Sequence, residues 1–247
     1  MTLSSNMTVR EIAIAVPNAT RVFEKLKIDY CCGGNQPLQE ACTQKGLRVE
    51  EVFKLLTEGG ATEVAAEAPD SQSQPLADLT RYIVAKHHVF TRSELERLTA
   101  LFHKVCSVHG QNHPELLQIQ SQFQILRVEL EPHMLKEERI LFPYIENLEA
   151  AVAENRPAPF APFGTVGNPI VAMMREHDAA GEILKAMREL GNDFVTPEDA
   201  CFSYGTLYSA LDALEADLHQ HIHLENNVLF PRSLEMEEKA QACMSKA

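Results

Sequence analysis

The chain of 247 residues is long enough for one large domain or two modest ones, and 45% hydrophobic with 23% charged residues is an ordinary water-soluble composition. A net charge of −13, without a cluster of Lys and Arg, argues against nucleic acid or an anionic membrane surface as a partner. No stretch approaches the roughly 20 apolar residues that cross a bilayer, so we expect no membrane association.

The cysteines and the N-terminus indicate a compartment. The six cysteines are scattered and do not form a disulfide framework. The N-terminal residues lack the basic start and the apolar core of a signal peptide. We therefore expect the protein in the reducing cytoplasm.

The first part of the chain has the pattern of a small helical domain. Thr8 and Glu11 have capping-box spacing and open a short helix that ends near Pro17. Residues 59–75 are small, polar and aperiodic, which is typical of a linker, so the first domain covers residues 1–58. Its other helices are expected at about 18–27, 37–45 and 48–58.

The remaining residues, 76–247, have the pattern of a larger helical domain. Pro197 suits a first helical position, with Thr196 as its cap, and further helix is open after Pro231. Four long amphipathic helices with mostly short connections indicate a four-helix bundle, so the whole protein is expected to be all-α. These helices are expected at roughly 76–108, 114–150, 168–190 and 197–230.

The apolar stripes of the four helices run into polar residues. In the fourth helix, for example, the spacing of Leu214 and Leu218 continues to His221. Positions on this stripe face the core of a bundle. The polar residues that continue the stripes are His87, His133, Glu137, His177, His221 and Glu225.

Such a set of core residues predicts a two-metal site. A carboxylate in a bundle core costs several kcal/mol unless its charge is compensated. The spacing of His133 to Glu137, and of His221 to Glu225, puts each pair on one helix face about 6 Å apart along the axis. A single core histidine is usually only hydrogen-bonded, but four of them with two glutamates favour metal ligands, the glutamates bridging two ions.

Other polar residues are weaker candidates. His109 would lie about 33 Å from His87 on one straight helix, so it stays an outside candidate. Glu129 and Glu176 could be hydrogen-bond partners of the ligands or surface residues. The histidines expected in solvent, off the stripe or near helix ends, are His88, His103, His113, His219 and His223.

Two adjacent cysteines are candidates for chemistry in the first domain. A bridge between Cys31 and Cys32 would be strained. Gly33 and Gly34 permit positive φ and would expose the pair on a tight turn, before a helix that would lower a nearby thiol pKa. We predict Cys31 and Cys32 as catalytic thiols, for group transfer or for sensing redox state; the alternative is a turn with one buried and one idle cysteine.

A repeated motif and a cysteine motif together resemble a known family. The pattern H-x-x-x-E-x-x-x-L-F-P occurs at 133–143 and again at 221–231. With the other histidines it resembles the hemerythrin-like di-iron bundles, Leu-Phe-Pro being structural. DYCCGG at 29–34 resembles the signature of the short domain that precedes the bundle in the RIC family (repair of iron centres), and REHDAAGE at 175–182 is also similar. The resemblance covers nearly the whole chain.

The resemblance implies a stress-response function. It implies two iron ions, bridged by carboxylates and by an oxo or hydroxo group, in a protein that restores iron–sulfur clusters damaged by nitric oxide or oxidants. Damaged iron–sulfur proteins, NO and O2 are the implied partners, and an outside electron donor is needed for turnover because no flavin or nicotinamide site is evident. Alternatives are an NO reductase and a sensor or carrier of O2, NO or iron. Whether the protein is an enzyme, whether it forms a homodimer, and whether zinc or manganese replaces iron stay open.

Overall fold

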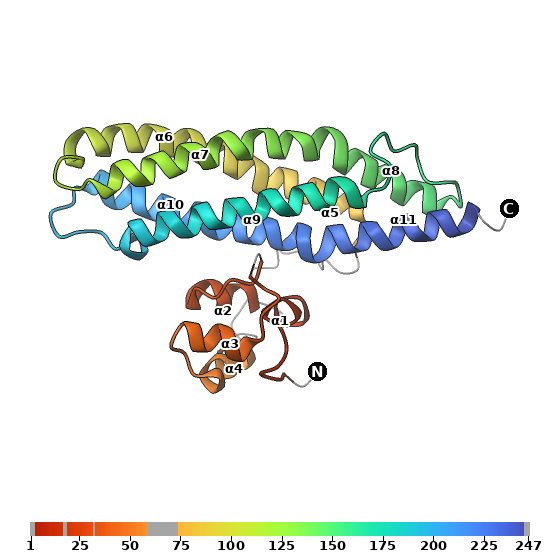
Figure 1. The fold of residues 1–247 in the computed structure, drawn as a ribbon, viewed down its shortest axis with the longest axis horizontal. Coiled ribbons are helices and arrows are strands. Elements are labelled where there is room, and N and C mark those ends of the chain that lie inside the picture. Colours follow the sequence, from red (N-terminus) through yellow and green to blue (C-terminus); the bar gives the residue numbers. More distant parts are fainter. Residues whose placement is uncertain (1–2, 17–18, 32, 59–73, 245–247) are drawn as a thin grey trace. The chain divides into compact units, whose positions relative to one another are not determined.

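The computed structural model describes residues 3–16, 19–31, 33–58 and 74–244, and helices make up most of them (Figure 1). Within these residues the extended pairing is an isolated bridge between Thr8 and Pro37. The predicted all-α class is therefore confirmed.

The described chain divides into two compact units. One consists of Met1–Gln74 together with His219–Leu229, and the other of Pro75–Leu218 together with Phe230–Ala247. In the part of the chain that the structure describes, no helix is both long enough and apolar enough to cross a membrane.

The N-terminal module has a hydrophobic core of its own. The predicted capping box is present, because Thr8 Oγ1 accepts from the Glu11 amide at 3.1 Å and the Glu11 carboxylate accepts from the Thr8 amide at 2.8 Å. Phe23, Tyr30 and Leu38 are fully buried in the core. The helices of this module are α1 (Val9–Ala15), α2 (Ala19–Leu26), α3 (Leu38–Gln44) and α4 (Val49–Glu58).

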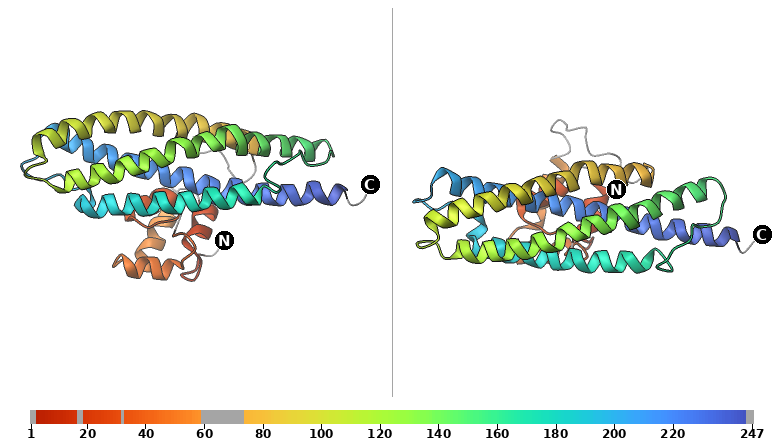
Figure 2. Two further views of the ribbon diagram at one scale, coloured as in Figure 1. Left: turned by 45° about the horizontal axis from the view of Figure 1, so that its top comes forward. Right: turned by 90° about the horizontal axis from the view of Figure 1, so that it is seen from above.

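Four long rods lie side by side in the larger domain (Figures 1 and 2). Three of them contain a π-helical segment (η2, η3 and η5), and the third rod is a single α-helix. In chain order the rods are α5 (Leu76–Ile83), η2 (Val84–His88) and α6 (Val89–His109); α7 (Glu115–Lys136), η3 (Glu137–Leu141) and α8 (Phe142–Ala153); α9 (Gly167–Leu190); and α10 (Phe202–Leu224), η5 (Glu225–Leu229) and α11 (Phe230–Met244).

One half of the bundle is filled by apolar side chains that the stripes provide. Phe102 and Phe123 are fully buried, with ring centroids 5.1 Å apart. The start of α5 is held by the carboxylate of Glu149, which accepts from the amides of Leu76 at 2.7 Å and Ala77 at 2.9 Å. This contact satisfies two of the amides that a helix N-terminus leaves without partners.

The start of the fourth rod differs from the prediction. Helix α10 begins at Phe202, so Pro197 is not a first helical position and Thr196 is not its cap. The reason lies in the preceding turn η4 (Asn192–Phe194), whose residues all have positive φ. The buried ring of Phe194 packs against Tyr208, 5.5 Å between centroids, and this contact keeps the following residues in a loop.

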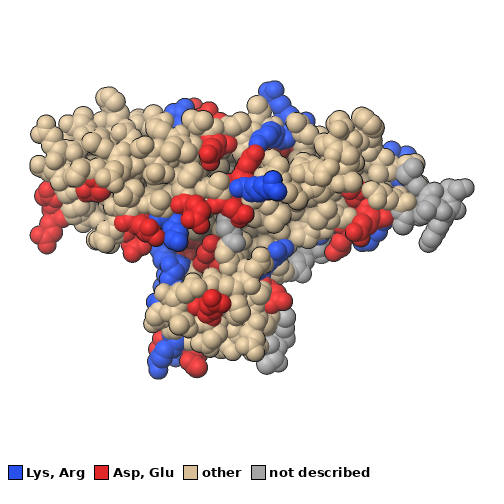
Figure 3. Space-filling model, viewed as in Figure 1, with Lys and Arg blue, Asp and Glu red and all other residues tan. Residues whose placement is uncertain are grey.

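Charged side chains of both signs are interspersed on the visible face of the bundle (Figure 3). Arg127 and Glu131, one turn apart on α7, form an ion pair at 3.0 Å. Acidic residues still outnumber basic ones, 35 to 22, over the whole sequence.

We expect the ion pair between His113 and Asp199 to titrate measurably. His113 Nε2 lies 3.1 Å from the Asp199 carboxylate and Nδ1 lies 3.0 Å from Glu115, and these acids raise the pKa of His113. The pair therefore contributes stability below the unfolded-state pKa of histidine, about 6.5, and loses it as pH rises through the higher folded-state pKa. In Asp199→Asn, NMR titration should give His113 a lower pKa than in the wild type.

The exposed neighbour Glu198 supplies the control. A Glu198→Gln variant removes the same charge but no contact with His113, so the His113 pKa should change little. Equal shifts in the two variants would mean that general surface charge, and not the contact, sets the pKa.

Candidate metal centre

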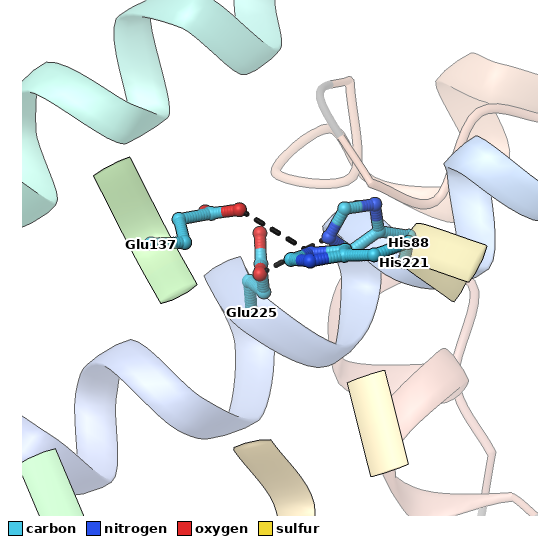
Figure 4. A group of neighbouring side chains, drawn as sticks. All are labelled: His88, Glu137, His221 and Glu225. Carbon is cyan, nitrogen blue, oxygen red and sulfur yellow. Dashed lines mark hydrogen bonds and ion pairs between the residues drawn. The ribbon is translucent and has the colours of Figure 1, made fainter. Parts of the chain in front are cut away.

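Six buried side chains from the four rods gather into two overlapping groups that could each hold a metal ion. Within each group, one possible ligand atom per residue lies within 4.8 Å of all the others. Figure 4 shows the side chains of the first group directed toward one another. The first group is His88, Glu137, His221 and Glu225, and the second is His133, Glu137, His177 and Glu225.

Glu137 and Glu225 belong to both groups, and both side chains are completely buried. Glu137 lies 3.4 Å from His88 Nε2 and 3.2 Å from His133 Nε2, while Glu225 lies 3.1 Å from His221 Nε2. Two buried carboxylates this close repel each other unless positive charge lies between them. Imidazole nitrogens and carboxylate oxygens at these separations suit two transition-metal ions, so the donor set fits the implied metals.

The candidate groups contain His88 and not the predicted His87. His87 is buried but lies in neither group; its Nδ1 is 3.0 Å from Asp217 Oδ1. The prediction that His88 faces solvent is wrong, because its side chain is fully buried. The physical reason is η2, where the Val89 amide bonds to the carbonyl of Val84, five residues back. One extra residue in that turn moves the inward position from 87 to 88.

The other two π segments begin at the shared glutamates, Glu137 and Glu225. In each case a proline, Pro143 or Pro231, follows the π segment by two residues. Proline has no amide hydrogen and its ring clashes with the carbonyl four residues back. A wider turn just before the proline relieves that clash, so each Leu-Phe-Pro favours the π segment that begins at its glutamate.

The phenylalanine of each Leu-Phe-Pro covers a histidine of the candidate site. Phe142 stacks on His88 with centroids 5.8 Å apart, and Phe230 stacks on His177 at 6.1 Å with the planes 3° from parallel. The sequence predicts a structural role for Leu-Phe-Pro but does not assign these rings to particular histidines. The duplication of the motif was the signal that could have identified them.

Glu176 contacts the site from outside, as one of its two sequence interpretations allowed. Its Oε2 lies 2.7 Å from His133 Nδ1, and its Oε1 pairs with Lys136. Partial burial opposes ionisation of this carboxyl, but the hydrogen bonds from Lys136 and His133 outweigh it and lower the pKa of Glu176. Glu129, the other candidate, is exposed.

The remaining histidines lie elsewhere. His109 is at the end of α6, 5.4 Å between ring centroids from Tyr204, and is in neither group. The prediction of a solvated His223 is wrong: the side chain is buried, Asn227 contacts its Nδ1 at 2.7 Å, and burial lowers its pKa to about 4. His103 is exposed, whereas His113 and His219 are partly buried.

Cys31 is buried, contrary to the expected exposed turn, and Cys32 lies outside the described residues. The carboxylate of Asp29 accepts from the amides of Cys31 and Gly33, both at 2.9 Å, and lies 3.3 Å from the Cys31 sulfur. Gly33 and Gly34 do not have positive φ. A glycine is needed at 34 because a Cβ there would lie 2.5 Å from the carbonyl oxygen of Tyr30.

The fold and the buried donor set define a cation-binding four-helix bundle of the hemerythrin class. Residues 79–233 match the hemerythrin HHE cation binding domain, and residues 5–59 match the ScdA_N domain, a domain of unknown function.

Similarity to named proteins extends over most of the chain. It is 38% identical to the iron–sulfur cluster repair protein YtfE of Pectobacterium atrosepticum, covering 93% of this chain and 97% of that one. It is 36% identical to a probable iron–sulfur cluster repair protein of Haemophilus influenzae, covering 91% and 95%. The Yersinia pseudotuberculosis YtfE is 34% identical, covering 93% and 97%. The chain therefore belongs to the family of these iron–sulfur cluster repair proteins.

Proposed function

We propose that this protein is a di-iron protein that repairs iron–sulfur clusters damaged by nitrosative or oxidative stress, by donating iron or removing NO. The single observation that carries the proposal is the pair of overlapping, buried His/Glu groups in a hemerythrin-type bundle. The names of relatives that match nearly the whole chain supply the substrate class, damaged iron–sulfur proteins.

The ligand set favours two ions that share both glutamates. His88 and His221 would hold one ion, and His133 and His177 the other, with Glu137 and Glu225 bridging. Two six-coordinate ions would offer about twelve positions, of which four histidines, two shared carboxylates and one oxo or hydroxo bridge would fill about ten. When bound, such a pair supplies about two open positions for a small molecule, and a source of iron for transfer.

The protein side chains determine access and orientation. Full burial of Glu137 and Glu225 keeps bulk water from the carboxylates. The contact of His133 Nδ1 with Glu176 favours a hydrogen on that nitrogen and leaves Nε2 for a cation. Cys31 and Cys32 stay our proposed catalytic thiols for the transfer of iron or nitrosyl.

A reconstituted repair assay tests the function. Iron-loaded protein, incubated anaerobically with an NO-damaged [4Fe–4S] hydratase, a reductant and inorganic sulfide, should restore hydratase activity. Cys31→Ser and Cys32→Ser should lower the rate on the order of tenfold, because each removes a group that takes part in transfer, with the iron content unchanged.

The exposed cysteine Cys201 provides the matched control, and Cys201→Ser should repair at the wild-type rate. Restoration no faster than with free ferrous iron would contradict the proposal. Anaerobic NO addition to the reduced, iron-loaded protein, whose ferrous ions supply the electrons, separates the other functions: stoichiometric nitrous oxide indicates an NO reductase, and NO retained unchanged indicates binding or sensing.

A further inference from the structure

His88 is held on three sides by one short stretch of the second rod. Its Nε2 lies 3.4 Å from Glu137 Oε2, its Nδ1 lies 2.7 Å from Glu138 Oε1, and its ring stacks on Phe142 with planes 20° apart. Two consecutive glutamates thus contact opposite nitrogens of one buried imidazole. The contact of Glu137 with Nε2 lies inside the first cation group. The contact of Glu138 with Nδ1 lies outside that group, and it fixes the orientation of the ring.

Glu138 is itself fixed from its other side. Arg92, one turn after His88 on the first rod, contacts Glu138 Oε1 through Nη1 at 2.8 Å. The Glu138 side chain is 22% exposed, whereas the His88 ring is fully buried. The carboxylate therefore lies between a half-exposed cation and a buried imidazole.

We propose that Glu138, held in place by Arg92, is a positioning residue that fixes the His88 ring and thereby sets how tightly one of the two metal ions is bound. A carboxylate at Nδ1 accepts the hydrogen of that nitrogen and leaves the Nε2 lone pair directed at the cation group. The inference rests on the proposed metal centre and adds Glu138 and Arg92 to it.

The second cation group has a related arrangement, which makes the inference specific to one ion. There Glu176, from the third rod, contacts His133 Nδ1 and pairs with Lys136. Each outer carboxylate thus contacts a histidine of a different group, so loss of Glu138 should weaken the ion held by His88 and spare the one held by His133.

Zinc binding to the metal-free full-length protein tests the proposal, with Zn²⁺ as the diamagnetic probe. Competition with a chelator should give two bound ions in the wild type. In Glu138→Ala one of them should bind about 10–100-fold more weakly, the usual effect of losing an outer hydrogen-bond partner of a metal-bound histidine. Glu138→Gln, which keeps an acceptor, and Arg92→Met, which keeps the carboxylate, should each show a smaller loss at that same ion.

A second measurement reports on the ring itself. Histidine ¹⁵N NMR of the zinc-loaded wild type should show His88 protonated on Nδ1, with slow exchange of that hydrogen. In Glu138→Ala the exchange should become fast, whereas a merely structural role for Glu138 would leave it slow.

Glu131→Ala is the matched control, because it removes a glutamate paired with an arginine that contacts none of the metal-group histidines. Two zinc ions bound with wild-type affinity in Glu138→Ala, or an equal loss in Glu131→Ala, would overturn the positioning role alone. A wild-type protein that binds no zinc and no iron would overturn the metal centre and this inference together.

Discussion

A Glu137→Ala variant should lose both metal ions, because the same carboxylate belongs to both cation groups. The wild type purified from iron-replete cells is expected to contain about two irons per chain, and the variant well under one. Glu225→Ala should behave the same way, since Glu225 is shared in the same manner. Metal analysis of both purified proteins measures the loss, and circular dichroism checks that the helices persist.

In the metal-free protein, replacing Glu137 is expected to raise thermal stability, although it lowers metal binding. Without a cation, Glu137 and Glu225 are two fully buried carboxyl groups in one cluster, and their burial costs free energy that a bound cation would offset. A metal-free Glu137→Gln protein should therefore melt at a higher temperature than the metal-free wild type, although it binds less metal. The claim that Glu137 binds both ions would be contradicted by one metal ion per chain in the wild type, or by wild-type metal content in Glu137→Ala.

The rods could be predicted because the apolar spacing is regular over many turns. Leu207, Leu211, Leu214 and Leu218 lie four and three residues apart, and all are buried in the core of the bundle. Regular α-helix carries that spacing onward without error, so His221 reaches the position that the stripe assigns. Local physical rules of this kind also gave the capping box of α1.

Prediction failed where the helix departs from 3.6 residues per turn. On the second rod, the four-and-three spacing that runs from His133 to Glu137 continues to Ile140, but Ile140 is 49% exposed and Leu141 is buried. The same one-residue offset exchanged His87 for His88. A π segment has no distinctive composition, and in the first rod no proline follows η2, so sequence periodicity alone could not reveal it.

The predicted conformation of the cysteine turn was wrong for a different reason, because a side chain competes with the backbone for the local hydrogen bonds. The two glycines suggest positive φ from sequence, whereas in the structure the side chain of Asp29 organises the turn by accepting from two backbone amides. Asp side chains often replace backbone groups in this way. The glycines serve close backbone approach instead, as the short distance at Gly34 indicates.

The exchange of His87 for His88 leads to a prediction that separates two adjacent histidines. His88→Ala should bind about one metal ion per chain and not two, because only the first cation group contains His88. His87→Ala should keep both ions. It should instead destabilise the fold by about 1–3 kcal/mol, because Asp217, whose Oδ2 has no hydrogen-bond partner, loses the histidine that contacts its Oδ1.

Metal content and chemical denaturation of the metal-free proteins measure the two effects separately. His103→Ala, at an exposed position of the same rod, should change neither quantity and serves as the control. The opposite result, with one ion lost in His87→Ala and both kept in His88→Ala, would mean that the first rod continues as regular α-helix through residues 84–88. The metal ligand of this rod would then follow the uninterrupted 3.6-residue periodicity, and the π segment would have no part in forming the centre.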